Sequence, residues 1–267
     1  MSGAVFMETL RRGWRGMLGW GIGMGIYGSL IVIIIQDADM LKQYGELTKS
    51  LPPALLALFG GDAALLATPE GFLGYGYFGY ALLILSVYLI LSGLNVTASE
   101  EEAGILDVVM SLPLPRPRAV GEKLAAYGLL FLGIIVISYM GLLVGLQFSA
   151  LEIDSGKLLQ STVNIIPAAL LILTFTAMSG SLFRSKGTAT MVATMFVVIS
   201  YFVNFIAQAA SETVFSALRW VSFFSYYDHN GVILRGLSWG NMALLLGVAG
   251  LCTAGAVLFF QRRDIGV

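Results

Sequence analysis

Side chains that could do chemistry are few in this sequence and are absent from its long apolar runs. The one histidine, His229, cannot supply both ligands of a His-x-x-x-His zinc site, and no Gly-x-Ser-x-Gly nucleophile motif occurs. The acidic run Glu100–Glu102 is a poor metal site, because adjacent residues on a helix point in different directions. Gly156 and Lys157 are followed by Leu158, which excludes a phosphate-binding loop there. The sequence therefore predicts a non-catalytic chain without a metal site, which would need a partner to use ATP.

Uncharged polar and aromatic residues inside the apolar runs are the candidates for a substrate path. Ser200, Asn204 and Gln208 recur every four residues and therefore share one face of a helix. The other candidates are Asn95, Asn164, Phe196 and Tyr201. Hydrogen bonding between helices, worth about 0.6 kcal/mol per bond, is the competing explanation for the polar groups. An uncharged path would favour an amphiphilic, lipid-like or drug-like cargo, with a sliding polymer as an alternative.

The stretch 99–123 is a polar segment with the pattern of a short amphipathic helix. Ser99 and Glu102 have capping-box spacing, so a helix is predicted from about residue 100 to residue 112. Its apolar stripe consists of Ile105, Val108, Val109 and Leu112. Prolines at 113, 115 and 117 end the helix, and the basic residues Arg116, Arg118 and Lys123 follow. The helix could dock on a soluble partner or lie on lipid headgroups.

The composition places these candidates in a membrane. Apolar residues make up 57% of the 267 residues, charged residues make up 12%, and the mean hydropathy is +0.85. Six charge-free runs are long enough to cross a bilayer: 17–35, 77–96, 124–148, 161–183, 187–210 and 241–260. Charges within a membrane usually mark ion paths, so a proton-coupled carrier would lack its working groups here. We predict an all-α, polytopic membrane protein with a single transmembrane domain over residues 1–267.

The distribution of positive charge predicts the orientation. With six spans, ten of the fifteen lysines and arginines fall on the side of the two termini and five on the other side. The positive-inside rule then places both termini and the helix 100–112 in the cytoplasm. We expect the spans to lie in the plasma membrane of a prokaryote. The scattered basic residues form no stripe that would suit nucleic acid.

Three further segments carry expectations of their own. The basic stretch 4–16 is predicted to be an interfacial helix before the first span, which offers glycine pairs for close packing at Gly19/Gly23 and Gly21/Gly25. The outer segment 36–76 is expected to hold a helix on the membrane surface around the apolar patch 51–59. The aromatic-rich segment 211–240 fits either the outer membrane interface or a re-entrant helical pair.

The stretch Glu100–Lys123 resembles the signature loop of the type-2 ABC transporter permeases. The resemblance rests on Ala103-Gly104-Ile105-Leu106-Asp107, on Met110-Ser111-Leu112-Pro113 and on the basic pair Arg116/Arg118 ahead of the third span. Asp107 stands where the family often has Glu, and Pro-Arg-Pro-Arg replaces a common Ser-Arg exit. Residues 68–72 and 224–228 resemble such permeases less specifically, and the six-span layout extends the likeness to the whole chain.

This resemblance implies half of an ATP-driven transporter. Two permease subunits, identical or homologous, would pair in membrane lipid, each docked through the coupling helix 100–112 on a soluble ABC ATPase that binds ATP and Mg²⁺. Glu101, Glu102, Gly104 and Asp107 would face or border that ATPase. Ile105, Val108 and Leu112 would fill its groove or face their own spans, and Arg116 and Arg118 would pair with partner carboxylates or lipid phosphates.

The sequence thus favours a permease subunit of an ATP-binding cassette exporter. One alternative is a secondary transporter or channel-like protein. The other is a membrane anchor or sensor that recruits a soluble partner without transport. Movement of cargo that requires an active ATPase separates the first reading from the second, and ATPase binding without transport would favour the third.

Overall fold

Six long helices form a bundle that confirms the all-α, six-span prediction. A computed structural model describes residues 3–34, 38–49, 63–97, 115–149, 153–183, 185–209 and 214–262, and no strand occurs among them. The stretches able to span a membrane are Ala4–Ile34, Pro69–Val96, Pro117–Gln147, Ser155–Leu182, Lys186–Ala209 and Trp239–Arg262. They correspond to α1 (Ala4–Ile34), α5 to α6 (Pro69–Leu73, η1 Gly74–Phe78, Gly79–Val96), α9 (Arg116–Gln147), α10 (Ser155–Leu182), α11 (Lys186–Ala209) and α14 (Trp239–Arg262).

Several spans extend further than their charge-free cores. α1 runs without a break from Ala4, so the separate interfacial helix predicted for residues 4–16 is wrong, and the basic stretch continues the first span. Its exposed Arg12 pairs with Glu8 at 2.7 Å one turn away, which keeps these charges on the helix surface. The second span begins at Pro69, where Thr68 caps the helix by accepting the Gly71 N–H.

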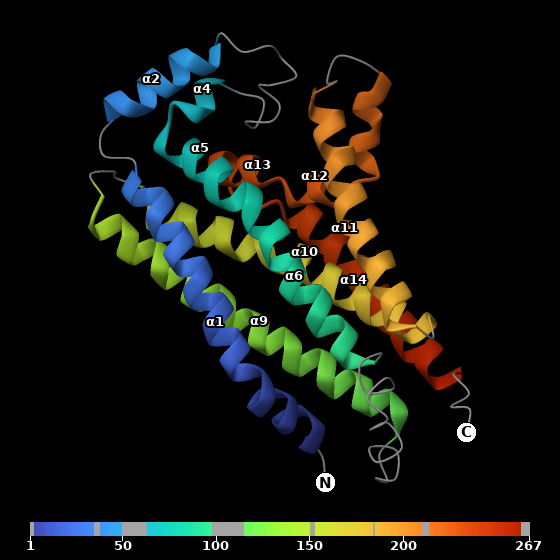
Figure 1. The fold of residues 1–267 in the computed structure, drawn as a ribbon. Coiled ribbons are helices and arrows are strands. Elements are labelled where there is room, and N and C mark those ends of the chain that lie inside the picture. Colours follow the sequence, from blue (N-terminus) through green and yellow to red (C-terminus); the bar gives the residue numbers. More distant parts are fainter. Residues whose placement is uncertain are drawn as a thin grey trace.

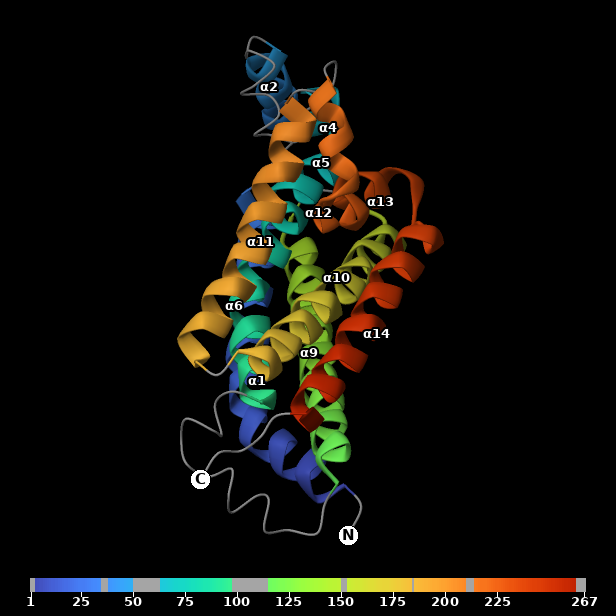
Figure 2. The same ribbon diagram turned by 90° about the vertical axis from the view of Figure 1, so that its right-hand side faces the viewer.

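The six helices lie in two layers (Figures 1 and 2). α1, α6 and α11 share one face, while α9, α10 and α14 lie behind them. α1 packs along α9, and α10 packs against both α14 and α6. The most apolar part of α10 is 72% buried, whereas that of α11 is only 22% buried. α10 is therefore the central helix of the chain, and α11 is its most exposed span.

Glycine allows α1 and α9 to approach closely. A Cβ atom on Gly141 would lie 2.3 Å from the Gly25 Cα, so position 141 does not accept a side chain, whereas a Cβ on Gly25 would meet the Gly141 Cα at 3.4 Å. Ser29 Oγ donates to the Gly141 carbonyl at 2.6 Å across the same contact. The predicted use of Gly21 and Gly25 in close packing is confirmed, whereas Gly19 and Gly23 have nothing within 4 Å of a built Cβ.

Short helices gather at one end of the bundle, opposite the start of α1 and the end of α14 (Figure 1). They are α2 (Ala38–Lys49), α4 (Ala63–Leu66), α5, η2 (Val214–Trp220), α12 (Phe223–Tyr227) and α13 (His229–Arg235). The sequence did not predict α2, and the patch 51–59 where a surface helix was expected lies outside the described residues. In α12, Phe223, Phe224 and Tyr227 are buried against the spans, which favours the re-entrant alternative for this segment.

Candidate functional site

The predicted coupling helix lies outside the described residues, and its two anchor points lie within them. Glu101, Glu102, Gly104, Ile105, Asp107, Val108 and Leu112 all belong to the undescribed stretch 98–114. That stretch leaves α6 after Thr97 and enters α9 at Arg116, whose side chain is also outside the description. What the structure shows is how these two helix ends are fixed.

Lys123 ties the start of α9 to the end of α6. Its Nζ donates to the Val96 carbonyl at 3.3 Å, and the residue is only 6% exposed. Val96 is the last residue of α6, where unpaired carbonyls carry partial negative charge that a lysine complements. Thr97 Oγ1 adds a bond to the Ala177 carbonyl of α10 at 3.4 Å. The point at which the loop leaves α6 is therefore fastened to both α9 and α10.

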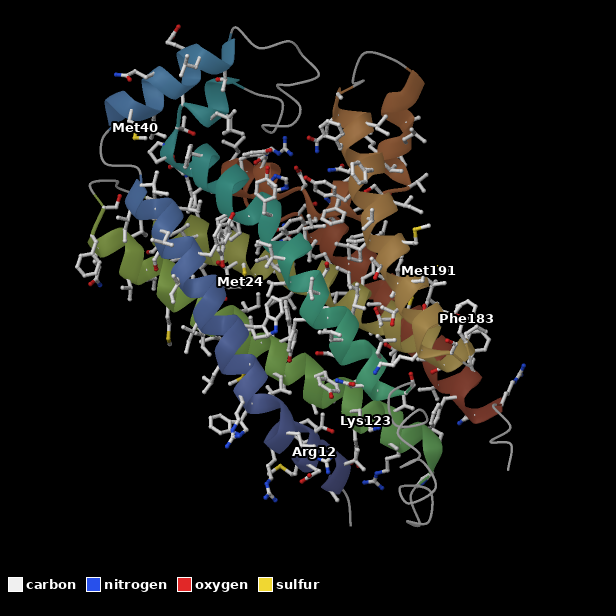
Figure 3. All side chains as sticks on the ribbon, in the orientation of Figure 1. Arg12, Met24, Met40, Lys123, Phe183 and Met191 are labelled. Atoms are coloured by element: carbon white, nitrogen blue, oxygen red, sulfur yellow. The ribbon has the colours of Figure 1, made fainter. Side chains whose placement is uncertain are left out.

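Glu122, the neighbour of Lys123, ties α9 to the start of α1. Its carboxylate accepts the backbone N–H of Gly3 at 3.1 Å and that of Phe6 at 3.3 Å, which caps the N-terminus of α1. Arg118 is exposed and pairs within the chain with Glu122, one turn away, at 3.1 Å. We call Val96, Arg118, Glu122 and Lys123 the coupling base. Lys123 and Arg12 lie toward the same end of the bundle (Figure 3).

Sequence reasoning found Arg118 and Lys123 as basic residues but missed Glu122. The signal available in the sequence was that Glu122 and Lys123 are adjacent and directly precede an apolar run. Their separate targets, the ends of α1 and α6, could not be inferred from spacing because these contacts are long-range.

The polar face of α11 holds α12 in place. Ser200 Oγ accepts the Phe223 N–H at 3.0 Å, and Ser222 Oγ donates to the Ser200 carbonyl at 2.6 Å. One turn further on, Asn204 Oδ1 accepts the Ser225 hydroxyl at 2.7 Å. Ser200 and Asn204 thus make the helix–helix hydrogen bonds that were the competing explanation for a substrate path.

Aromatic stacking continues this contact. The Phe196 ring stacks on Phe175 of α10 with centroids 4.0 Å apart and on Phe223 of α12 at 5.1 Å. Phe223 in turn stacks on Phe224 at 4.6 Å, and the Phe224 ring meets Tyr201 edge-on at 5.4 Å. These rings join three elements in one aromatic column.

Asn164 joins the same region from α10, and the two remaining candidates do not. The Asn164 amide donates to the Tyr227 carbonyl, and Tyr227 Oη donates to the Phe78 carbonyl at 2.8 Å. Asn95 and Gln208 are exposed, and within the described residues neither reaches the α12 network. The sequence candidates therefore separate into a buried or half-buried group around α12 and two surface residues.

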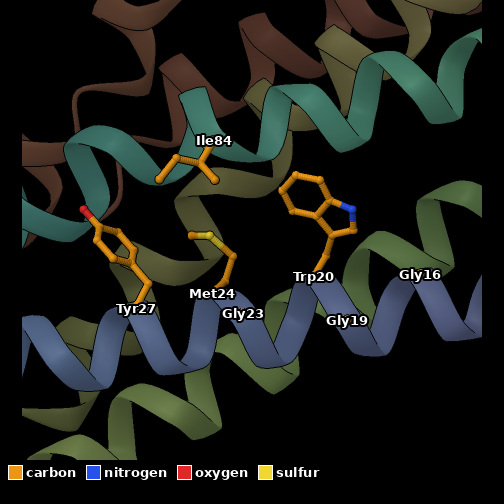
Figure 4. A pocket seen from close by; sticks show the side chains of 7 residues that line it. All are labelled: Gly16, Gly19, Trp20, Gly23, Met24, Tyr27 and Ile84. Carbon is orange, nitrogen blue, oxygen red and sulfur yellow. The ribbon is translucent and has the colours of Figure 1, made fainter.

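A cavity of about 470 Å³ lies between α1 and α6 (Figure 4). Its lining is Gly16, Gly19, Trp20, Gly23, Met24, Tyr27 and Ile84. Trp20, Met24 and Tyr27 rise from α1 toward α6, while the three glycines leave its floor flat. This lining carries no charge, so the cavity suits an apolar chain or helix. The glycine spacing was visible in the sequence, but the partner α6 was not.

Comparison with protein families gives a match that covers nearly the whole bundle. The family described as multidrug efflux system permease Rv1217c, C-terminal domain, matches residues 7–261. A comparison with curated proteins gave no match. The matched range includes most of α1, all five further spans and the coupling base. The chain is a multi-pass membrane protein that belongs to this family of multidrug efflux permease domains.

Proposed function

We propose that this chain is the transmembrane permease subunit of an ATP-binding cassette exporter in a prokaryotic plasma membrane. A separate soluble ABC ATPase would bind ATP and Mg²⁺ and dock on the stretch 100–112, with both termini in the cytoplasm. The observation that carries the proposal is the coupling base, which fastens both ends of the predicted docking loop to the spans of an efflux permease domain.

The coupling base offers a path for mechanical force. A push on the loop reaches α9 at Arg116, and Lys123 and Glu122 pass it to the end of α6 and the start of α1. Because α1 is packed along α9 through glycine contacts, these two helices would move as one body. The central helix α10 would receive the same movement through Thr97.

A second permease subunit would complete the layer of α1, α6 and α11. The α11 side chains exposed on the outside of the bundle include Met191, Met195, Ile199, Phe202 and Ile206. The open glycine face of α1 beside α6 can receive such a helix, and a two-fold axis would pair each α11 with the other subunit's cavity. The matching family is itself named as the C-terminal domain of a permease, which fits a partner domain in the assembly.

The cargo we propose is amphiphilic, lipid-like or drug-like. The name of the matching family refers to multidrug efflux, and the cavity between α1 and α6 is lined by apolar and aromatic side chains. Transport without the ATPase would instead support the secondary transporter or channel alternative, and ATPase binding without transport would support the anchor or sensor.

Lys123→Met tests the coupling base. In vesicles containing the permease and its ATPase, we expect ATP-driven export of a fluorescent amphiphilic dye to fall about tenfold. The hydrogen bond from the charged Lys123 stabilises the contact between α9 and α6 by about 1.5–3 kcal/mol. A loss of about 1.4 kcal/mol in a conformation that export needs slows export about tenfold. Dye fluorescence measures the export, and co-purification measures ATPase binding, which should persist.

Two variants serve as controls for this measurement. Lys123→Arg keeps a donor to the Val96 carbonyl and should retain most export. Lys157→Met makes the same change in the half-buried ion pair with Glu70 at the other end of the bundle and should leave export near normal, because that pair lies far from the coupling base. Full export by Lys123→Met contradicts the role of the base, and export that needs no ATPase contradicts the proposed function.

A further inference from the structure

A π-helical turn at the top of the second span is held from two sides by tyrosines. The turn, η1, spans Gly74–Phe78 between α5 and α6. Tyr27 Oη of α1 donates to the Gly76 carbonyl at 2.5 Å, and Tyr227 Oη of α12 donates to the Phe78 carbonyl at 2.8 Å. π-turns inside α-helices are rare, and those that occur often lie at functional sites. The third element that packs on this turn is therefore a candidate for a functional role.

That third element is α13, which meets the turn with two enclosed polar atoms. His229 Nε2 is shielded from solvent, has no hydrogen-bond partner among the described residues, and lies 3.3 Å from where a Cβ of Gly79 would be. Asn230 Oδ1 is in the same situation beside Gly74, also at 3.3 Å. The pair therefore rests on the first residue of the π-turn, Gly74, and on the residue that follows the turn, Gly79.

The charged groups around α13 are already paired with one another. Asp228 pairs with Arg235 at 2.9 Å, and Glu70 of α5 pairs with Lys157 of α10 at 3.3 Å. The remaining titratable groups on the neighbouring elements are Asp154, which caps α10 by accepting the Gly156 N–H at 2.8 Å, and the tyrosines Tyr75, Tyr77, Tyr80, Tyr226 and Tyr227. Tyrosines are neutral in acid, so none of them can neutralise a charged imidazole. The carboxylates Glu70, Asp154 and Asp228 each already accept a bond within the chain.

Burial lowers the pKa of His229 from 6.5 to about 4. The packed state favours the neutral ring. The His229 contact therefore stabilises the packing of α13 fully above pH 6.5, and this stabilisation decreases as the pH falls toward 4. Between these limits, opening of the contact takes up one proton and becomes about tenfold more favourable per pH unit.

We propose that His229 is an acid-sensitive latch that holds α13 on the π-turn at the end of the bundle opposite the start of α1. When the ring is neutral, α13 stays packed on Gly74 and Gly79. When the ring is protonated, the charge has to reach solvent, and α13 separates from the second span. The Tyr227 bond to Phe78 comes from α12, so the release begins at α13 and not at the buried aromatic column.

Hydrogen–deuterium exchange of the full chain in lipid nanodiscs tests the latch. Protection of the amides in residues 229–236 is compared with that of residues 243–256 in α14 from pH 7 to pH 4.5, after correction for intrinsic exchange. We expect protection of α13 to fall by up to about 100-fold over this range, while protection of α14 stays constant. Unchanged protection of α13 in the native chain overturns the proposal.

His229→Gln is the decisive variant, because it keeps a polar side chain of similar reach that does not titrate. We expect its α13 protection to be independent of pH. Asp228 and Glu70 remain in this variant, so a fall in protection that survives the substitution would assign the acid effect to them and overturn the latch. His229→Phe provides a second non-titrating variant in case glutamine alters the packing. None of these measurements requires the ATPase, so their outcome is separate from that of the proposed function.

Discussion

Ser222 is the residue that most directly fixes the short helix α12. It is fully buried and caps α12 by accepting the Phe224 N–H at 3.2 Å, and it donates to the Ser200 carbonyl at 2.6 Å. A single hydroxyl thus serves both as the cap of a short helix and as its link to α11. Re-entrant segments need such bonds, because unpaired backbone groups are expensive at membrane depth.

Ser222→Ala removes these bonds, and we predict a loss of about 1–3 kcal/mol of stability, since a capping bond and a buried bond disappear together. Thermal unfolding in detergent, followed by size-exclusion fluorescence, measures the effect. Thr253→Ala is the matched control, because among the described residues the Thr253 hydroxyl bonds only to the Ala249 carbonyl in its own helix. Equal melting temperatures for the two variants would show that Ser222 does not anchor α12.

The sequence identified one side of this contact and not the other. The four-residue spacing of Ser200 and Asn204 placed both on one face of α11, and the structure confirms that they share it. Their partners Ser222 and Ser225 lie in a segment without a periodic pattern. Because α12 has only five residues, no hydropathy signal could separate it from an interfacial aromatic belt.

At the scale of elements, the α1–α9 pair is the best defined unit of the chain. Its contact depends on backbone approach at Gly25 and Gly141, supported by Ser29 Oγ. Lipid supplies little hydrophobic driving force between helices, so such close packing is a main source of their association. The charge-free runs predicted the two spans, and the glycine spacing on α1 offered two faces, of which the one with Gly21 and Gly25 packs on α9.

Gly141→Val should therefore separate these helices. We predict a destabilisation of about 1–3 kcal/mol, since the new side chain would overlap the Gly25 backbone and force the helices apart. The melting temperature of the purified protein provides the measurement. Gly250→Ala on α14 is the control, because a Cβ there meets nothing within 4 Å. A stable Gly141→Val variant would refute the close contact.

The second span shows where sequence patterns stop being informative about an element. The charge-free run predicted a start at residue 77, whereas the helix starts at Pro69 and contains the π-turn. Thr68 before Pro69 was a readable start signal, since both residue types favour helix N-termini. The π-turn itself follows from long-range contacts of Tyr27 and Tyr227, which no local pattern reports.

At the scale of the whole molecule, one face of the bundle is incomplete. α1, α6 and α11 lie side by side in the front layer (Figure 1), yet the cavity between α1 and α6 is open and α11 is largely exposed. The sequence predicted six spans and a partner subunit, but it could not predict this layer. Which helices face a partner depends on how the other spans pack.

Cysteine cross-linking tests this face. Gly23→Cys on one tagged copy and Met191→Cys on a second copy, both with Cys252→Ser, should give a cross-linked dimer in membranes with a short bismaleimide. Met24, beside Gly23, and Met191 lie at similar heights in the bundle (Figure 3). Gly250→Cys in place of Gly23→Cys is the control on the opposite layer. Equal cross-linking from Gly250 would contradict pairing through the α1–α6 cavity.

The sparse burial of α11 has a consequence for the life of the protein in the cell. A newly inserted copy carries a span with few internal neighbours, and the exposed methionines and phenylalanine on it would contact lipid until the proposed second subunit covers them. Membrane proteases that degrade unassembled proteins would then act on copies whose α11 is weakly packed. If the proposed pairing holds, the abundance of the subunit would then depend on its assembly with the second subunit.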